Sequence, residues 1–104
     1  MPTSQYRVAV TARARADFRE IAGYLREESP ALALRIVRKR RLSSAELGDR
    51  ALRYALLPSH EASGIRRRVV GSYNIFYRVV GDRVEVLHVL HHARDHEPLL
   101  VPED

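Results

Sequence analysis

The sequence predicts an α+β fold in which a helical hairpin packs on a small, twisted antiparallel sheet. Two observations carry this prediction. Apolar residues recur with the helical period between residues 12 and 57, and they alternate with the two-residue period of strands before and after that stretch. The expected order is β-α-α-β-β-β, in a single domain of residues 1–104 with flexible ends at 1–4 and 99–104.

The length and composition indicate one folded domain. A chain of 104 residues, 45% of them hydrophobic, is long enough for one core, because a fold of this size buries roughly 60% or more of its unfolded surface. It is too short for two domains. No apolar run approaches the roughly 20 residues that span a bilayer, and Met1–Ser4 does not begin a secretion signal. We therefore expect a cytoplasmic protein without membrane contact.

The charge balance indicates an acidic partner. The formal net charge is +5, and Lys39 is the only lysine; nucleic acid and an acidic protein segment both fit such a charge. Arginine has a planar donor fork that suits phosphates and carboxylates, and it keeps its proton, so catalysis by a lysine base is nearly excluded. Genome base composition explains the arginine excess equally well. The absence of cysteine excludes disulfides, thiol nucleophiles and cysteine-ligated zinc.

The chain opens with a strand and a helix. Tyr6, Val8 and Val10 alternate with Arg and Ala, which is the pattern of a strand with one buried face. Thr11 can cap the helix that follows, which ends near Glu28. This helix has one apolar stripe, formed by Ala14, Phe18, Ile21, Ala22 and Leu25. Such a stripe is expected to pack against another element.

A sharp boundary after the first helix predicts a helical hairpin. Ser29 can cap a second helix, and Pro30 suits its first turn. The connection is only a few residues long, so the two helices are expected to lie antiparallel. Leu57-Pro58 ends the helical region, and Ser59–Gly64 is a polar loop.

Residues 31–57 form either one helix or two. Arg40 and Ser44 interrupt the apolar face, and Ser43–Glu46 has the pattern of a capping box, which would divide the segment near Leu42. We favour one helix with a kink.

The last part of the chain predicts a three-stranded meander. The strands are expected at Ile65–Val70, Tyr73–Val80 and Arg83–Leu90. Gly71-Ser72 and Gly81-Asp82 are two-residue hairpin turns. The middle strand is apolar on both faces, so we place it centrally, with Tyr73 and Tyr77 in the core. Residues 94–100 add a turn of helix or an extended tail.

The order of elements and several motifs resemble the ParE/RelE superfamily of toxins, and its ParE branch more closely. The strongest motifs are Tyr73–Val79 (YNIFYRV) and Val84–Asp95 (VEVLHVLHHARD), and the similarity spans residues 6–96. Weaker matches are Tyr6–Thr11, Ala16–Ile21, Ser29–Ala33, Leu57-Pro58 and Gly64–Arg66. The chain departs from the branch after Pro58, where a glycine often follows sooner than Gly64 does here.

The resemblance implies the toxin of a type II toxin–antitoxin system, a class linked to plasmid stabilization and growth arrest, which a cognate antitoxin neutralises. ParE toxins poison DNA gyrase without chemistry of their own, and this is the function we expect. We expect no cofactor and no metal, and we expect contact with DNA to be indirect, through the antitoxin. The candidate target-binding residues are Arg66, Arg78, His91, His92, Arg94 and Asp95. For each of them a structural role is an equal alternative.

A RelE-like, ribosome-dependent mRNA endonuclease is the alternative within the superfamily. Its catalytic residues would be Arg66, His91, His92 and Arg94, moving protons and steadying phosphate charge. Adjacent strand residues point to opposite faces, so only one of the two histidines can join Arg66. The lysine cluster of such enzymes is absent. A non-toxic family member that binds nucleic acid is a third possibility, because a fold does not determine a function.

His88 is expected to be a structural, half-buried histidine rather than a ligand. It shares a strand face with His92, but no third side chain has suitable spacing for a metal site.

The resemblance also implies grooves that an extended antitoxin segment covers as it folds on binding. The candidate antitoxin-binding residues are Arg13, Arg15, Arg38 and Arg41. The first two lie in or near the positive first turn of a helix, where each costs a few tenths of a kcal/mol, roughly; contact with acidic side chains would explain their presence. The run Arg38–Arg41 is a solvated basic patch, with acidic contact as the alternative.

Overall fold

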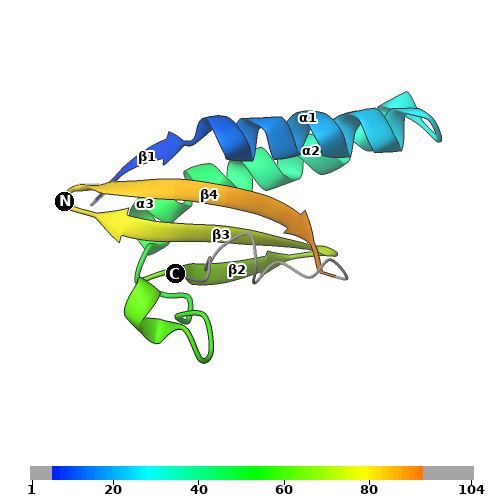
Figure 1. The fold of residues 1–104 in the computed structure, drawn as a ribbon. Helices are drawn as coiled ribbons and strands as arrows, with labels where there is room; N and C mark the ends of the chain where they lie inside the picture. The colour runs from blue at the N-terminus through cyan, green and yellow to red at the C-terminus, as the bar shows by residue number, and fades with distance from the viewer. Residues whose placement is uncertain (1–5, 93–104) are drawn as a thin grey trace.

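The computed structural model describes residues 6–92. They form the predicted order of a strand, a helical hairpin and three strands, with a short additional helix after the hairpin (Figure 1). The elements are β1 (Arg7–Val10), α1 (Ala12–Arg26), α2 (Pro30–Ala45), α3 (Leu47–Arg50), a 3₁₀ turn (Glu61–Ser63), β2 (Arg66–Val70), β3 (Tyr73–Val80) and β4 (Arg83–His91). The predictions for residues 1–4, 94–100 and 99–104 lie outside the described residues.

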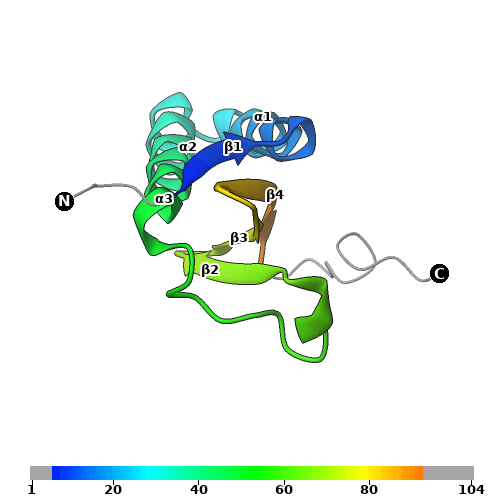
Figure 2. The same cartoon turned by 90° about the vertical axis from the view of Figure 1, so that its left-hand side faces the viewer.

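Local signals start both long helices where the sequence predicts. The Oγ1 atom of Thr11 accepts a hydrogen bond from the amide of Ala14 (3.2 Å), and the Oγ atom of Ser29 accepts one from the amide of Leu32 (3.2 Å). Pro30 occupies the first turn of α2. Each cap satisfies an amide that has no partner inside its own helix. The two helices lie side by side over the sheet (Figures 1 and 2), so the predicted hairpin is confirmed.

The favoured single helix over residues 31–57 is wrong. The structure has two helices, α2 and α3, which meet at Glu46 rather than near Leu42. Ser44 does not take part in a cap of the second helix. Its hydroxyl donates to the carbonyl oxygen of Arg40 (2.9 Å), one turn back within α2.

Two long-range hydrogen bonds account for the end of the helical region. The amide of Tyr6 donates to the carbonyl oxygen of Gly48 (3.1 Å), and the hydroxyl of Tyr77 donates to that of Ala51 (2.6 Å). In a continuing helix these carbonyls would accept from amides four residues further on. The start of β1 and the centre of β3 therefore take over the acceptors that a longer helix needs.

The sheet has the order β1-β4-β3-β2. Both antiparallel hairpins form through the predicted turns, at Gly71-Ser72 and Gly81-Asp82, whose glycines have φ of 60°. β1 pairs with β4 in parallel, with Arg7 opposite Arg83. The sheet is thus mixed, and the expectation of a wholly antiparallel sheet is corrected for this strand. No turn joins β1 to β4, so the local signals that set the direction of a hairpin do not act on it.

The central strand β3 is buried on both faces, as predicted. On the side of the helices, Ile75 and Tyr77 are completely buried in the main core. On the other side, Phe76 belongs to a smaller cluster with Leu57, Ile65 and Leu90, beneath the segment that leads from the helices into β2. This segment includes the predicted polar loop, and it ends with Gly64 in the left-handed region at φ 75°.

Candidate functional site

One face of α2 has exposed positive charge. Arg38 and Lys39 lie three and four residues after Arg35, and Leu42 lies four and three residues after them, so all four lie on the same side of the helix. Within residues 6–92 none of the three cations forms an ion pair. Leu42 is 62% exposed. This face therefore combines uncompensated charge with an accessible apolar side chain.

Arg40 belongs to the run Arg38–Arg41, but unlike Arg38 and Lys39 it is not exposed, and its side chain connects α2 to the sheet. It is buried, its Nη2 atom donates to the carbonyl oxygen of Val70 (3.0 Å), and its guanidinium lies 5.0 Å from the ring centre of Tyr73. Burial lowers the pKa of Arg40, and the charge of Tyr73 acts in the opposite direction. The expectation of a fully solvated patch at Arg38–Arg41 is wrong for this residue, because its side chain has a backbone acceptor and an aromatic face within reach.

A second arginine links β2 to the end of α2. Nη1 of Arg68 donates to the carbonyl oxygen of Ser43 (2.7 Å) and lies 2.9 Å from Oε1 of Glu46. Arg50 approaches the same carboxylate at 3.7 Å. The single carboxylate of Glu46 is thus shared by two arginines, so the net charge of these three side chains is positive.

These residues enclose a groove between α2 and the edge of the sheet, with a volume of about 610 Å³. We call it the basic groove. It is lined by Arg35, Arg38, Lys39, Leu42, Ser43, Glu46, Arg50, Arg68, Val69 and Val70. Five cations thus line it together with one carboxylate, an arrangement that attracts a negatively charged partner.

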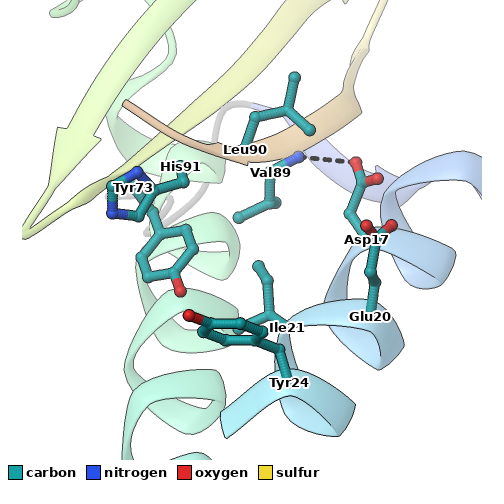
Figure 3. A pocket seen from close by; sticks show the side chains of 8 residues that line it. All are labelled: Asp17, Glu20, Ile21, Tyr24, Tyr73, Val89, Leu90 and His91. Atoms are coloured by element: carbon teal, nitrogen blue, oxygen red, sulfur yellow. Dashed lines mark hydrogen bonds between the residues drawn. The ribbon is translucent and has the colours of Figure 1, made fainter. Parts of the chain in front are cut away.

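A second hollow, of about 410 Å³, lies between α1 and the end of β4 (Figure 3). Ile21, Tyr24, Tyr73 and Val89 form much of its wall, and it is mainly apolar. Burial raises the pKa of the Tyr73 hydroxyl, while Arg40 opposes the shift. This hollow is therefore chemically different from the basic groove.

Asp17 closes the inner side of that hollow. Its Oδ2 atom accepts a hydrogen bond from the amide of Val89 (2.9 Å) and lies 2.9 Å from Nδ1 of His88 (Figure 3 shows the first contact). Both side chains are buried. The structural role expected for His88 is thereby confirmed, and its buried partner was not predicted.

The two histidines at the end of β4 lie together, contrary to the expectation of opposite faces. Their rings are 4.5 Å apart and stacked, and His91 also meets the ring of Tyr73 edge-on at 5.4 Å. The strand ends at His91, and the backbone amide of His92 donates to the carbonyl oxygen of Ser72 (2.9 Å). The alternation of a strand therefore no longer applies at His92.

Arg66 is not part of this histidine cluster. It lies opposite Tyr77 on β3, whereas His91 lies opposite Tyr73. Four residues of strand separate the two positions, about 13 Å along the sheet. Nη1 of Arg66 donates to the carbonyl oxygen of Tyr54 (2.7 Å). The structure thus does not bring the predicted arginine and histidines together, and Arg94 and Asp95 lie outside the described residues.

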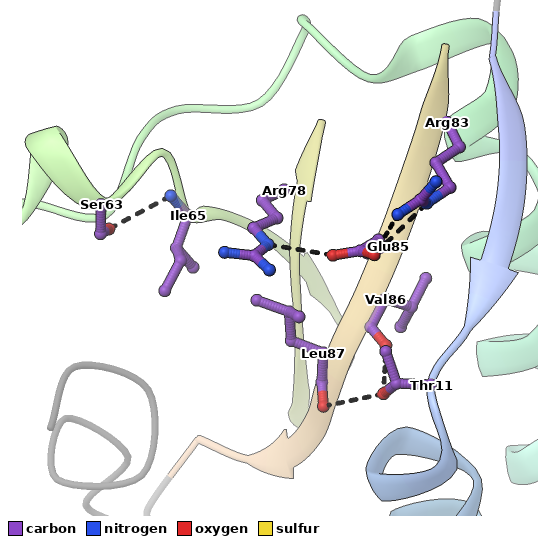
Figure 4. A network of polar contacts seen from close by, with 8 residues as sticks. All are labelled: Thr11, Ser63, Ile65, Arg78, Arg83, Glu85, Val86 and Leu87. Carbon is purple, nitrogen blue, oxygen red and sulfur yellow. Dashed lines mark hydrogen bonds and ion pairs between the residues drawn. The ribbon is translucent and has the colours of Figure 1, made fainter. Parts of the chain in front are cut away.

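Arg78 takes part in a surface ion-pair network (Figure 4). Its Nε atom donates to Oε1 of Glu85 (3.0 Å), and Nη2 of Arg83 donates to Oε2 (3.0 Å). Hydrogen bonds from Arg83 and then Arg78 hold the pKa of Glu85 below its usual value. Nearby, the hydroxyl of Thr11 donates to the carbonyl oxygen of Val86 (2.7 Å), where β1 ends.

The four predicted antitoxin-binding residues lie in three places. Arg38 lines the basic groove. Arg41 lines a separate hollow of about 390 Å³ between the two long helices, with its guanidinium 5.5 Å from the ring of Phe18. Arg13 and Arg15 are exposed at the start of α1.

Sequence reasoning missed Arg50 and Arg68 as site residues. They come from α3 and β2, far in sequence from Arg38, and only the fold brings them to one groove. The available signal was the run Arg66–Arg68, three successive arginines on a strand.

Among the described residues, no three His, Asp or Glu side chains are grouped so that they could hold a metal ion. No helix within residues 6–92 is long and apolar enough to cross a membrane.

The fold has known counterparts. A chain of the "Chromosomal ParDE TA system from P. aeruginosa" is 23% identical, with a TM-score of 0.72 over 84% of this chain and 96% of that chain. A chain of the RelBE2 toxin–antitoxin complex from Mycobacterium tuberculosis is 24% identical, with a TM-score of 0.60 over 85% and 99%. The domain thus has the RelE/ParE-like fold.

The sequence shows to which family within this fold the chain belongs. The family described as "ParE toxin of type II toxin-antitoxin system, parDE" matches residues 8–96. The chain therefore belongs to the ParE toxin family, which confirms the resemblance expected over residues 6–96. No curated protein sequence matches it.

Proposed function

We propose that a cognate antitoxin silences this toxin by placing acidic side chains in the basic groove. The observation that carries the proposal is the groove itself, where Arg35, Arg38 and Lys39 have no acidic partner among the described residues. Opposite charges across such an interface speed association and align the partners. The net charge of +5 also attracts an acidic partner.

We further propose that the target is DNA gyrase, which the toxin poisons without chemistry of its own. The separation of Arg66 from the two histidines supports this choice over RNA cleavage. Arg66 and Arg78 already bind a carbonyl oxygen and a carboxylate within the domain. Family membership carries the rest of the argument.

A gyrase cleavage-complex assay tests the target. The purified toxin, released from its antitoxin and refolded, is incubated with gyrase and supercoiled plasmid, and linear DNA is scored after detergent and protease. We expect linear DNA that disappears when the antitoxin is added. A folded toxin that produces none would remove gyrase as the target.

The second candidate is ribosome-dependent cleavage of mRNA. One observation favours it: His91 and His92 are exposed and stacked at the end of β4, where an imidazole could reach a nucleotide. Cleavage of ribosome-bound mRNA that Arg66→Ala abolishes is the expected result under this alternative. A toxin that leaves mRNA intact excludes it.

A further inference from the structure

The strand that borders the basic groove is an edge of the sheet. β2 is last in the order β1-β4-β3-β2 (Figure 2). On its outer side, Leu56 forms a bridge with Arg66, and the amide of Arg67 donates to the carbonyl oxygen of Ala55 (3.2 Å). The chain segment that makes these contacts covers the start of β2. The end of the strand, at Arg68–Val70, continues beside the groove.

The peptide groups of Val69 point outward from this edge. Val70 and Tyr73 flank a two-residue turn, and Arg67 donates away from β3. Backbone direction alternates along an antiparallel strand, so Val69 has the same outward orientation as Arg67. Val69 is also 61% exposed. An additional strand would lie about 4.8 Å from β2 at this point.

The chemistry of the groove selects an acidic polypeptide. The outward N–H and C=O of Val69 match another peptide backbone, and the exposed side chain of Leu42 matches aliphatic side chains. A phosphate backbone has no N–H to donate to the outward C=O, and it has no aliphatic side chains to contact Leu42. A second copy of this chain would bring five further cations against the five already present, which like-charge repulsion opposes.

We propose that an acidic segment of the antitoxin adds to the sheet as a fifth strand along Arg68–Val70. Its carboxylates then lie beside Arg35, Arg38 and Lys39, and its aliphatic side chains contact Leu42. This inference rests on the proposed function, because it assumes that an antitoxin binds the toxin.

Val69→Pro tests the added strand. Proline removes the N–H that a fifth strand needs, and an edge strand tolerates it where that N–H faces outward. Val69→Ala is the matched control, because it shortens the side chain and keeps the N–H. The affinity of each refolded variant for the antitoxin is measured by calorimetry, and circular dichroism checks the fold. We expect Val69→Pro to bind at least about tenfold more weakly and Val69→Ala to stay within about threefold.

Hydrogen exchange on the unmodified complex gives an independent readout. The Val69 amide should exchange more slowly when the antitoxin is bound, even if the proline variant fails to fold. Unchanged exchange at Val69, with tight binding of the wild type, overturns the fifth strand and leaves the antitoxin proposal intact. No binding by the wild type overturns both. Tight binding of a 20-base-pair DNA duplex that Val69→Pro leaves unchanged would assign the groove to phosphates and also overturn the inference.

Discussion

The carboxylate of Asp17 in α1 lies 2.9 Å from Nδ1 of His88 in β4 and also accepts the amide hydrogen bond of Val89. β1 covers the edge of β4 only as far as Val86. Beyond that residue, a side chain of α1 supplies the acceptor that a neighbouring strand would otherwise provide. One buried carboxylate therefore fixes the position of α1 on the sheet.

Asp17→Ala should lower the free energy of unfolding by about 2–4 kcal/mol, because it leaves the Val89 amide and the His88 ring buried without their acceptor. Arg19→Ala, at an exposed position of the same helix, should change it by less than about 0.5 kcal/mol. Urea unfolding of both variants measures the difference. Equal stabilities would mean that water satisfies the two groups as well as Asp17 does.

Gly71 and Gly81 offer a matched pair of substitutions. Both have φ of 60°, where a side chain costs roughly 1–2 kcal/mol. A methyl group at Gly71 would also overlap Nη2 of Arg40, whereas nothing lies near Gly81. Gly71→Ala should therefore cost about 1–3 kcal/mol more than Gly81→Ala.

Removing Arg40 provides the control for this comparison. In an Arg40→Ala background the overlap is gone, so the two glycine substitutions should have similar costs in thermal or urea unfolding. A difference that persists without Arg40 would show that the contact is not its cause.

The hydroxyl of Tyr77 predicts a loss of stability in alkaline solution. Burial, the largest effect, raises its pKa from 10.0 to about 12. A folded-state pKa above the unfolded one gives stability that is complete below pH 10 and is lost between pH 10 and about 12, because the unfolded chain ionises first. The stability advantage of the wild type over Tyr77→Phe should therefore shrink across this range.

At neutral pH the same substitution has a separate cost. Tyr77→Phe removes the hydrogen bond to the carbonyl oxygen of Ala51, which should lower the unfolding free energy by about 1–2 kcal/mol. Urea unfolding of both proteins at pH 8, 10 and 11 separates the two effects. A constant difference between them at all three pH values would contradict the raised pKa.

Charge reversal tests the antitoxin contacts. Arg38→Glu with Arg41→Glu should weaken antitoxin binding by at least about tenfold at moderate salt, and the effect should diminish as salt rises. Arg53→Glu, at an exposed position outside the groove, controls for net charge. The two single variants then show whether the basic groove or the hollow beside Arg41 matters more. If calorimetry finds the same affinity for the double variant as for the wild type, Arg38 and Arg41 do not contact acidic side chains of the antitoxin.

Short-range features were predictable because their signals lie within a few residues. Thr11 and Ser29 cap the helices as expected, and the two glycine turns form the hairpins. Each of these depends on one residue type and its immediate neighbours. The order of elements and the resemblance to the toxin family followed from such signals.

Long-range features were not predictable in the same way. The parallel direction of β1 and the break at Glu46 depend on contacts with residues far away in the chain. The basic groove also depends on long-range contacts, since Arg68 and Arg38 line the same groove only when β2 lies beside α2. Arg40 resembled its charged neighbours in sequence, and its burial depends on the turn at Gly71.

The parallel pairing of β1 with β4 has a consequence for the timing of folding. Arg7 and its partner Arg83 lie close to the two ends of the described residues 6–92, with both long helices and two of the strands between them in the chain. Contacts between such distant residues slow folding, because a long loop must close first. During synthesis the four-stranded sheet accordingly cannot be completed until β4 has followed β1, the helices and the other two strands out of the ribosome, so an antitoxin that recognises the sheet meets its surface only late.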